Sequence, residues 1–203
     1  MIAFPVSRFR ILITPGLADS SHFSIQRTEI LETVELAVAA GIEMVQIREK
    51  QLPARPLFDL VREAATLTSG TETRLLVNER FDIALAAGAD GVHLTSTSMP
   101  VDLVRGSVPP GFIIGVSTHS SEEVATAEES GANYAMLGPI FATPGKDDPI
   151  GLDELARVSR AVSPFRVVAV GGIDASNAAS VIEAGAEGVA AIRYLNDFVR
   201  IGQ

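Results

Sequence analysis

Cysteine and tryptophan are missing from this chain, and aromatic residues make up only 5% of its 203 residues. Without cysteine the protein has no disulfide, no thiolate metal site and no cysteine nucleophile. A core with so few aromatic rings must rest on aliphatic side chains, which are the residues that fill parallel sheets buried on both faces. Hydrophobic residues reach 47% of the chain, so enough apolar side chains are present for such a core.

Positive charge is also scarce, because 16 Lys and Arg residues face 25 Asp and Glu residues, which gives a net charge of -9. This balance argues against nucleic-acid binding, and it means that an anionic ligand must be held by a local cluster of cations. No apolar run reaches the length of a membrane span, and residues 1–5 lack the basic start of a secretion signal. We therefore expect a cytoplasmic protein without nucleic-acid or membrane partners.

Short apolar runs alternate along the chain with segments that carry apolar residues at helical spacing. Such alternation predicts a parallel sheet, and eight units in 203 residues favour a closed barrel over an open, doubly wound sheet. We therefore expect an α/β fold, a single (β/α)8 TIM-barrel domain over residues 1–203. The predicted strands are 11–14, 43–47, 74–77, 91–94, 112–116, 134–137, 166–170 and 188–192, and helical spacing is clearest in 30–40, 57–67 and 122–129.

A glycine recurs in the loop before every second predicted strand, at Gly41, Gly88, Gly131 and Gly185. Each follows a helical segment and suits the left-handed position that ends a helix. This spacing is expected of a barrel built from βαβα quarters. The alternative is that loops between a helix and a strand favour glycine in any fold.

In a barrel of this kind the loops after the strands build the site, so the strand ends carry the functional predictions. After the second strand, Gln46, Arg48 and Lys50 alternate and share one side. An arginine fork and a lysine point charge together predict an anion site. The alternative is a solvated loop with a surface ion pair to Glu49.

Asn78 and Glu79 follow the third strand. An amide and a carboxylate there are suited to a polar heterocycle or a metal ion. Asn78 could equally cap the helix that begins near Phe81. After the fourth strand, His93 is interpreted as a structural histidine, and the Ser/Thr run 95–98 as a turn and N-cap ahead of a helix.

Ser117 and His119 share a face at the end of the fifth strand, and Gly115 is expected to leave space beneath them for a flat ligand. A histidine at a barrel strand end is well placed for acid–base catalysis near neutral pH. The same segment fits a capping box formed by Ser120 and Glu123, which would leave His119 free. No zinc-ligand spacing accompanies this histidine.

The last three strand ends predict a lid and a phosphate site. The loop 138–148 is long for its position and carries Thr143 and Lys146, as a lid would. Gly171 and Gly172 let backbone N–H groups approach a ligand before a helix. Barrel phosphate sites commonly follow strands seven and eight, so we expect a phosphate at these glycines, with Ile192 and Arg193 beside it. The alternative is that Arg193 lies outside the phosphate site.

Five segments in this order resemble the thiamin phosphate synthase family, which includes the thiazole tautomerases. They are VQIREK at 45–50, GVHL at 91–94, IGVSTH at 114–119, GPIF at 138–141 and GGI at 171–173. Each segment is short, but their order and spacing are specific, and the resemblance covers nearly the whole chain.

The resemblance implies residue roles. A synthase joins a pyrimidine pyrophosphate to thiazole phosphate with magnesium. The family pattern places the thiazole phosphate on the backbone near Gly172 and the end of strand eight, and it places Ser117 and Thr143 in the polar lining. It assigns to the pyrimidine pyrophosphate Gln46, Arg48, Lys50, Asn78 and Lys146.

Three departures from the synthase pattern bear on the activity. Glu79 and Ser98 stand where synthases have the two aspartates that hold magnesium, and Arg193 replaces a small residue. Magnesium usually needs one or two carboxylates, so this pattern weakens the case for pyrophosphate chemistry. The tautomerase relatives need no magnesium and use a histidine after strand five, which His119 matches.

We therefore expect a thiazole tautomerase, an isomerase with His119 as proton shuttle and no cofactor, acting on a phosphorylated thiazole. The alternative is a thiamin phosphate synthase, a transferase that uses magnesium with Glu79 as a ligand. A third hypothesis is a non-catalytic barrel that binds thiazole or thiamin phosphate as a regulator. A homo-oligomer is expected, with the number of subunits left open.

Overall fold

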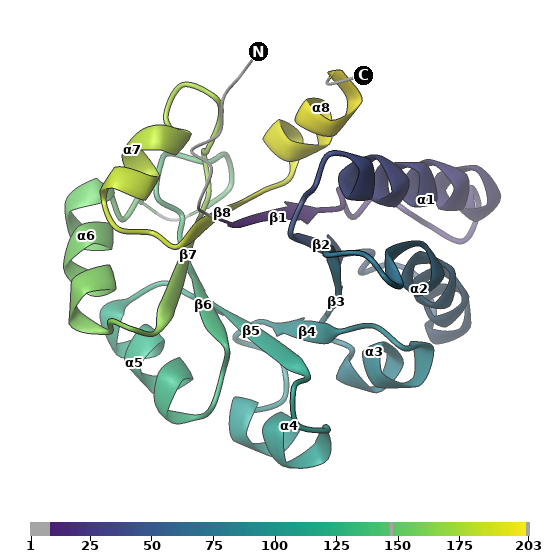
Figure 1. Cartoon of the computed structure of the whole chain (residues 1–203), viewed down its shortest axis with the longest axis horizontal. Helices are drawn as coiled ribbons and strands as arrows, with labels where there is room; N and C mark the ends of the chain where they lie inside the picture. Colours follow the sequence, from purple (N-terminus) through teal and green to yellow (C-terminus); the bar gives the residue numbers. More distant parts are fainter. Residues whose placement is uncertain (1–8, 147, 202–203) are drawn as a thin grey trace.

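Eight parallel strands close into a barrel in the computed structural model, which describes residues 9–146 and 148–201, and a helix follows each strand (Figure 1). The strands are β1 (Phe9–Ile13), β2 (Met44–Ile47), β3 (Arg74–Asn78), β4 (Gly91–Leu94), β5 (Ile113–Thr118), β6 (Tyr134–Leu137), β7 (Arg166–Val170) and β8 (Gly188–Ala191). The helices are α1 (Phe23–Ala39), α2 (Ala54–Thr68), α3 (Phe81–Ala87), α4 (Val101–Ser107), α5 (Ser121–Glu129), α6 (Leu152–Ala161), α7 (Ala178–Glu183) and α8 (Arg193–Ile201). The predicted (β/α)8 barrel is confirmed.

The predicted strands differ from the observed ones only at their ends. β1 begins two residues earlier than the apolar run, because Phe9 pairs with Gly188 of β8 where the barrel closes. β5 extends to Thr118, which pairs with Leu137 of β6. Residues 1–5 and Asp147 of the loop 138–148, both considered in the sequence, lie outside the described residues.

Alternation along the strands separates two parts of the core. Ile11 and Ile13 point into the barrel with Tyr134 and Met136, in a cluster made only of strand residues. Leu12, between the two isoleucines, belongs to the outer cluster that packs strands against helices. The interior is therefore filled by side chains, and a ligand must bind at the ends of the strands rather than along the axis.

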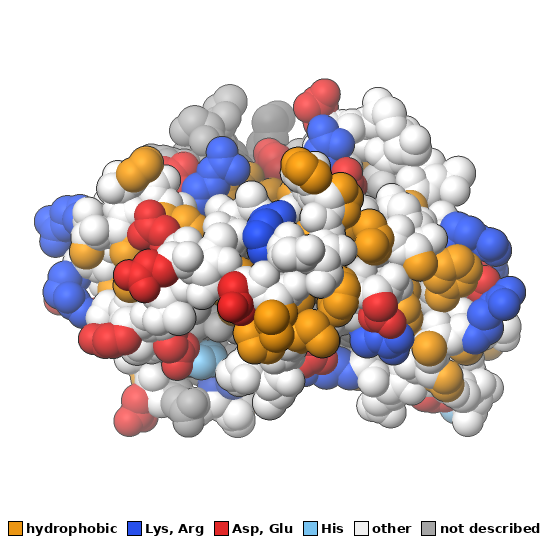
Figure 2. Space-filling view, turned by 90° about the horizontal axis from the view of Figure 1, so that it is seen from below, with side chains coloured by type: hydrophobic (Ala, Val, Ile, Leu, Met, Phe, Trp, Pro, Cys, Tyr) orange, Lys and Arg blue, Asp and Glu red, His pale blue; other side chains and the backbone are white. Residues whose placement is uncertain are grey.

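The four recurring glycines take the conformation predicted for them. All have a positive φ, and Gly88 (φ 80°) is the left-handed residue that ends α3. Figure 2 shows basic side chains interspersed with acidic ones over the face seen from below, without a continuous basic stripe. No helix in the described ranges is long and apolar enough to cross a membrane.

Candidate active site

A cavity of about 1530 Å³ opens at the carboxyl ends of the strands. Strand ends and the loops that follow them line it, as the fold requires. Twelve of the residues proposed from the sequence lie in its wall: Gln46, Arg48, Lys50, Asn78, Ser117, His119, Thr143, Lys146, Gly171, Gly172, Ile192 and Arg193. Glu79, the metal ligand of the synthase alternative, lies behind Asn78 and is not among the lining residues.

Alternation after β2 separates the cations from Glu49. Glu49 is buried on the other side, where its carboxylate accepts hydrogen bonds from the Thr14 hydroxyl at 2.6 Å and from the Gly16 and Ala18 N–H groups at 3.2 and 2.8 Å. Glu49 therefore holds the β1–α1 loop and makes no ion pair with Arg48, so the alternative of a surface ion pair is wrong. No carboxylate in the described ranges pairs with the Arg48 guanidinium, which lies half-buried in the cavity wall.

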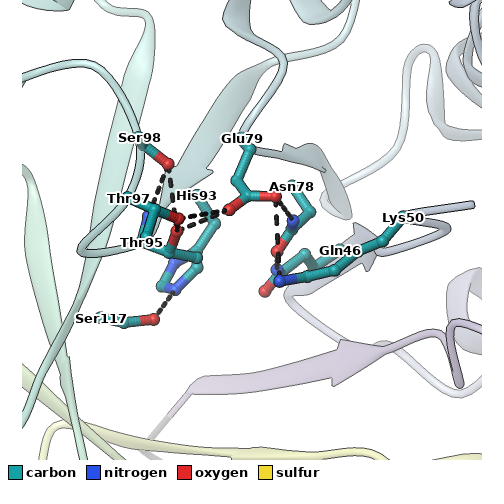
Figure 3. Close-up of polar contacts among 9 residues, drawn as sticks. All are labelled: Gln46, Lys50, Asn78, Glu79, His93, Thr95, Thr97, Ser98 and Ser117. Carbon is teal, nitrogen blue, oxygen red and sulfur yellow. Dashed lines mark hydrogen bonds and ion pairs between the residues drawn. The ribbon is translucent and has the colours of Figure 1, made fainter.

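Glu79 has a backbone conformation that is costly for its residue type. Its φ of 63° is the only positive value of a non-glycine residue in the described ranges. Its Oε1 accepts a hydrogen bond from the Thr95 hydroxyl at 2.6 Å, and its Oε2 lies 3.8 Å from the Lys50 ammonium (Figure 3). Strain of this kind persists where surrounding contacts fix it, and it clusters at functional sites.

Asn78 does not cap a helix, so that alternative is wrong. The N-cap position of α3 belongs to Arg80, without a side-chain hydrogen bond. The Asn78 side chain points to the cavity instead, where its Nδ2 donates to Glu79 Oε2 at 3.0 Å and its Oδ1 accepts from Gln46 Nε2 at 3.0 Å. Gln46 Oε1 is buried and accepts no hydrogen bond within the described part of the chain.

His93 is buried and has a partner on each side of its ring. Nδ1 lies 3.0 Å from the Tyr134 hydroxyl, and Nε2 lies 2.9 Å from the Ser117 hydroxyl. Burial lowers the pKa of His93 to about 3, so the ring is neutral at physiological pH. This agrees with a structural histidine, and it gives Ser117 a fixed position in the cavity wall.

The space beneath Ser117 is not open, contrary to the sequence-based expectation. A Cβ at Gly115 would lie 2.0 Å from Cζ of Tyr134, its register partner on β6. The tyrosine ring therefore occupies the place that the glycine leaves. Gly115 serves the packing of the barrel interior, and a flat ligand cannot enter there.

His119 is exposed in the cavity wall, with Nδ1 2.6 Å from the Gly138 carbonyl oxygen. Because a carbonyl only accepts, Nδ1 donates in this contact, and Nε2 is the acceptor whenever the ring is neutral. Ser120 caps α5 as predicted, through the Glu123 N–H at 3.2 Å. The Glu123 carboxylate accepts from the His119 N–H at 2.7 Å, one residue before the cap.

The Ser/Thr run 95–98 forms the predicted turn but not the predicted cap. The Ser98 N–H donates to the Thr95 carbonyl, and α4 begins after Pro100 without a side-chain cap. The Thr95 hydroxyl instead contacts Glu79, and Thr95 lines the cavity. The sequence did not indicate the role of Thr95, because its partner Glu79 follows a different strand, β3.

The paired glycines hold the neighbouring loop as well as facing the cavity. A Cβ at Gly171 would lie 2.6 Å from Pro139, and one at Gly172 would lie 2.7 Å from Phe141, so the β6–α6 loop packs directly on them. α7 begins only at Ala178, so the glycines do not immediately precede a helix. α8 does begin directly after β8, which brings its first turn to the cavity at Ile192 and Arg193.

Further groups complete this side of the cavity. Sequence reasoning did not single out Asp174, Ser176, Tyr194 and Asp197, which all line it. The one signal was the position of Asp174, two residues after Gly172. The Asp174 carboxylate accepts from the Ser176 N–H and hydroxyl, which lowers its pKa, so an anionic ligand must avoid this carboxylate.

Comparisons with known proteins agree with this architecture. A family model described as thiamine monophosphate synthase matches residues 17–195. The chain is 45% identical over 165 residues to a thiamine-phosphate synthase of Moorella thermoacetica, covering 80% of this chain and 78% of that protein. It is 44% identical over 164 residues to a thiamine-phosphate synthase of Methanoculleus marisnigri, covering 79% and 77%.

A solved structure is also similar over almost its whole length. The thiamine phosphate pyrophosphorylase from Pyrococcus furiosus superimposes with a TM-score of 0.79 at 30% identity, covering 95% of this chain and 92% of that one. These relatives contradict the tautomerase and isomerase assignment made from the sequence, because they carry the synthase name. That assignment gave too much weight to the missing aspartates, although Glu79 keeps a carboxylate at the strand end.

Proposed function

Because this chain belongs to the thiamine monophosphate synthase family, we propose that it is a thiamine-phosphate synthase, a transferase that couples a pyrimidine pyrophosphate to thiazole phosphate. The observation that carries this proposal is the sequence identity of 44–45% to two proteins named thiamine-phosphate synthase, together with the family match over residues 17–195, which include Arg48, Glu79 and Gly172. In the reaction, the thiazole forms a bond to the carbon that joins the pyrimidine ring to the pyrophosphate. The C–O bond of that carbon breaks, and pyrophosphate leaves with its electron pair.

The cations of the cavity support binding of the pyrophosphate. Arg48 and Lys50 lie just after β2, and Lys146 lies in the β6–α6 loop across the barrel. Arg48 offers a planar fork for phosphate oxygens, and the two lysines offer point charges. In a chain of net charge -9 these side chains supply the local positive potential, which favours departure of a charged leaving group.

The oxygen atoms around Glu79 fit magnesium, the ion that the family implies. Glu79 supplies one carboxylate, and Thr95 and Ser98 supply hydroxyl oxygens beside it. Magnesium prefers hard oxygen ligands and is usually held by one or two carboxylates plus substrate phosphates. Glu79 would thus hold the ion together with the pyrophosphate, and the ion would neutralise charge on the leaving group.

The opposite side of the cavity suits the thiazole phosphate. None of the described hydrogen bonds uses the Gly172 N–H, and the first turn of α8 opens toward the same space. Backbone N–H groups at a helix start favour an anion. We place the phosphate between Gly172 and Arg193, so the two substrates meet over Ser117 at the centre of the cavity.

The experiment mixes the purified protein with both substrates and magnesium and measures thiamine phosphate by mass spectrometry. The Arg48→Ala variant should raise the KM for the pyrimidine pyrophosphate by about 10-fold or more, since a charged hydrogen bond is lost. Arg55→Ala is the matched control, because Arg55 is an exposed arginine on α2 that pairs with Asp59. Binding of both substrates without product would overturn the proposal.

A further inference from the structure

Three side chains from neighbouring strand ends form a directional hydrogen-bond chain on one side of the cavity (Figure 3). Gln46 Nε2 donates to Asn78 Oδ1, and Asn78 Nδ2 donates to Glu79 Oε2, both at 3.0 Å. We call Gln46, Asn78 and Glu79 the amide relay. The relay ends on the cavity side with Gln46 and on the outer side with Glu79.

Glu79 determines the direction of the relay. An ionised carboxylate only accepts hydrogen bonds, whereas each amide can present either its oxygen or its NH2 group. Asn78 must therefore turn its NH2 group to Glu79, which leaves its oxygen facing Gln46. Gln46 must then turn its own NH2 group to Asn78, since two amide oxygens would repel each other.

The consequence is an unpaired acceptor at the end of the relay. Gln46 is 1% exposed, and its Oε1 has no hydrogen-bond partner within the described ranges. Buried polar groups almost always have a partner, so an exception calls for an explanation. Gln46 lines the cavity, so with its Nε2 held by Asn78 its Oε1 is the atom left to accept a hydrogen bond from a ligand there.

Glu79 itself is held on both sides. Its Oε1 accepts from the Thr95 hydroxyl at 2.6 Å, and Lys50 lies 3.8 Å from Oε2. Its left-handed φ of 63° is maintained although glutamate rarely adopts it. A carboxylate that is fixed in this way can impose its orientation on the two amides at no further cost on ligand binding.

We propose that Glu79 is a positioning residue that makes Gln46 an obligate acceptor, so that the site selects a pyrimidine carrying an exocyclic amino group. A pyrimidinone presents a carbonyl oxygen at the same place, and two acceptors would face each other. The proposal rests on the proposed function for the pyrimidine itself. It adds the residue that sets the hydrogen-bond polarity of that subsite.

The test measures binding of two probes by calorimetry in buffer with a chelator. One is a 4-aminopyrimidine and the other is the matching pyrimidin-4-one, each with the same hydroxymethyl group and no phosphate. The probes avoid the cations and any metal ion, so the readout is the ratio of their dissociation constants. The parent protein should bind the amino probe about 10-fold or more tightly than the pyrimidinone.

Two variants separate orientation from a purely structural role. In Glu79→Leu the ratio should fall toward one, while the affinity for the pyrimidinone is kept, which also shows that the variant is folded. Adding Gln46→Glu to that variant should restore the preference, because a carboxylate presents an oxygen however it turns. Thr97→Val is the matched control. The Thr97 hydroxyl lies 3.5 Å from Oε1 of Glu79 and 3.2 Å from the Thr95 hydroxyl, away from the Oε2 that faces Asn78, so its ratio should equal the parent's.

A parent ratio near one, or a full ratio in Glu79→Leu, would overturn the proposal even if the protein makes thiamine phosphate. The predicted ratios in a protein that makes no thiamine phosphate would support the relay and count against the proposed function. The two ideas therefore fail separately.

Discussion

Tyr134 fills the place that Gly115 leaves vacant, with its Cζ 2.0 Å from where a Cβ would lie. The two residues are register partners on β5 and β6, and the tyrosine hydroxyl lies 3.0 Å from Nδ1 of His93. A glycine that resembles a ligand-binding feature in the sequence is thus part of the barrel interior, and it places His93 and, through it, Ser117.

Gly115→Ala should destabilise the protein by about 1–3 kcal/mol, because the methyl group forces the buried ring of Tyr134 to move. Chemical denaturation measures this change. Gly106→Ala is the matched control, since nothing lies within 4 Å of a Cβ there and α4 gains from alanine. Equal stability of Gly115→Ala and the parent would show that the interior has room.

His93 should make stability depend on pH. Its pKa in the folded protein is about 3, below the 6.5 of the unfolded chain, so between these values the unfolded state binds more protons. The free energy of unfolding should therefore rise with pH across this window, with a slope approaching about 1.4 kcal/mol per pH unit from this residue.

Urea titrations at pH 5.0, 5.5, 6.0 and 7.0 would measure that slope. His93→Gln should lower the slope between pH 5 and 6.5, because glutamine does not titrate. Carboxylates with lowered pKa values, such as Asp174, change charge below pH 5, so they do not contribute to the slope between pH 5 and 6.5. The same slope in His93→Gln and in the parent would mean that His93 is protonated when folded.

Glu49→Gln should destabilise the β1–α1 loop by roughly 1–3 kcal/mol. The buried carboxylate accepts from Thr14, Gly16 and Ala18, and an amide presents an NH2 group to one of these donors. Thermal melting and hydrogen exchange of the loop would measure the loss. Glu29→Gln, an exposed carboxylate on α1, is the control and should leave both unchanged.

The double variant Glu79→Asp with Ser98→Asp should bind magnesium more tightly than the parent. The change at position 98 adds a second carboxylate beside the one at position 79. Aspartate also tolerates the left-handed backbone of position 79 better than glutamate does. Calorimetry with pyrophosphate present measures the affinity, and Ser98→Ala serves as the matched variant without a new charge. An unchanged affinity in the double variant would show that this edge of the cavity does not hold the ion.

The strands and the lining residues could be predicted because their signals are local. Gln46, Arg48 and Lys50 share a face by the pleat alone, and a strand end in this fold faces the cavity whatever its partners are. The contact of Gly115 with Tyr134 could not be predicted in the same way. It joins residues 19 apart through a strand pairing, and a sequence shows a glycine without showing what occupies its space.

Glu79 illustrates the same limit at the site. As a carboxylate at a strand end, Glu79 could bind a polar heterocycle or a metal ion. As a replacement for aspartate, it favoured the tautomerase assignment, which is wrong. Its contacts with Lys50 and Thr95 come from the ends of β2 and β4, on either side of β3, so only the pairing of these three strands brings the side chains together. The sequence showed that the carboxylate at position 79 is longer and that the one at position 98 is lost, but it could not show where the Glu79 carboxylate lies.

The most direct test of the central claim is the stoichiometry of products formed by the purified parent protein. With the pyrimidine pyrophosphate, thiazole phosphate and magnesium, pyrophosphate and thiamine phosphate should appear in equal amounts, and both should stop when a chelator removes the ion. The absence of thiamine phosphate, with both substrates bound and magnesium in excess, would contradict the assignment of this barrel as a synthase.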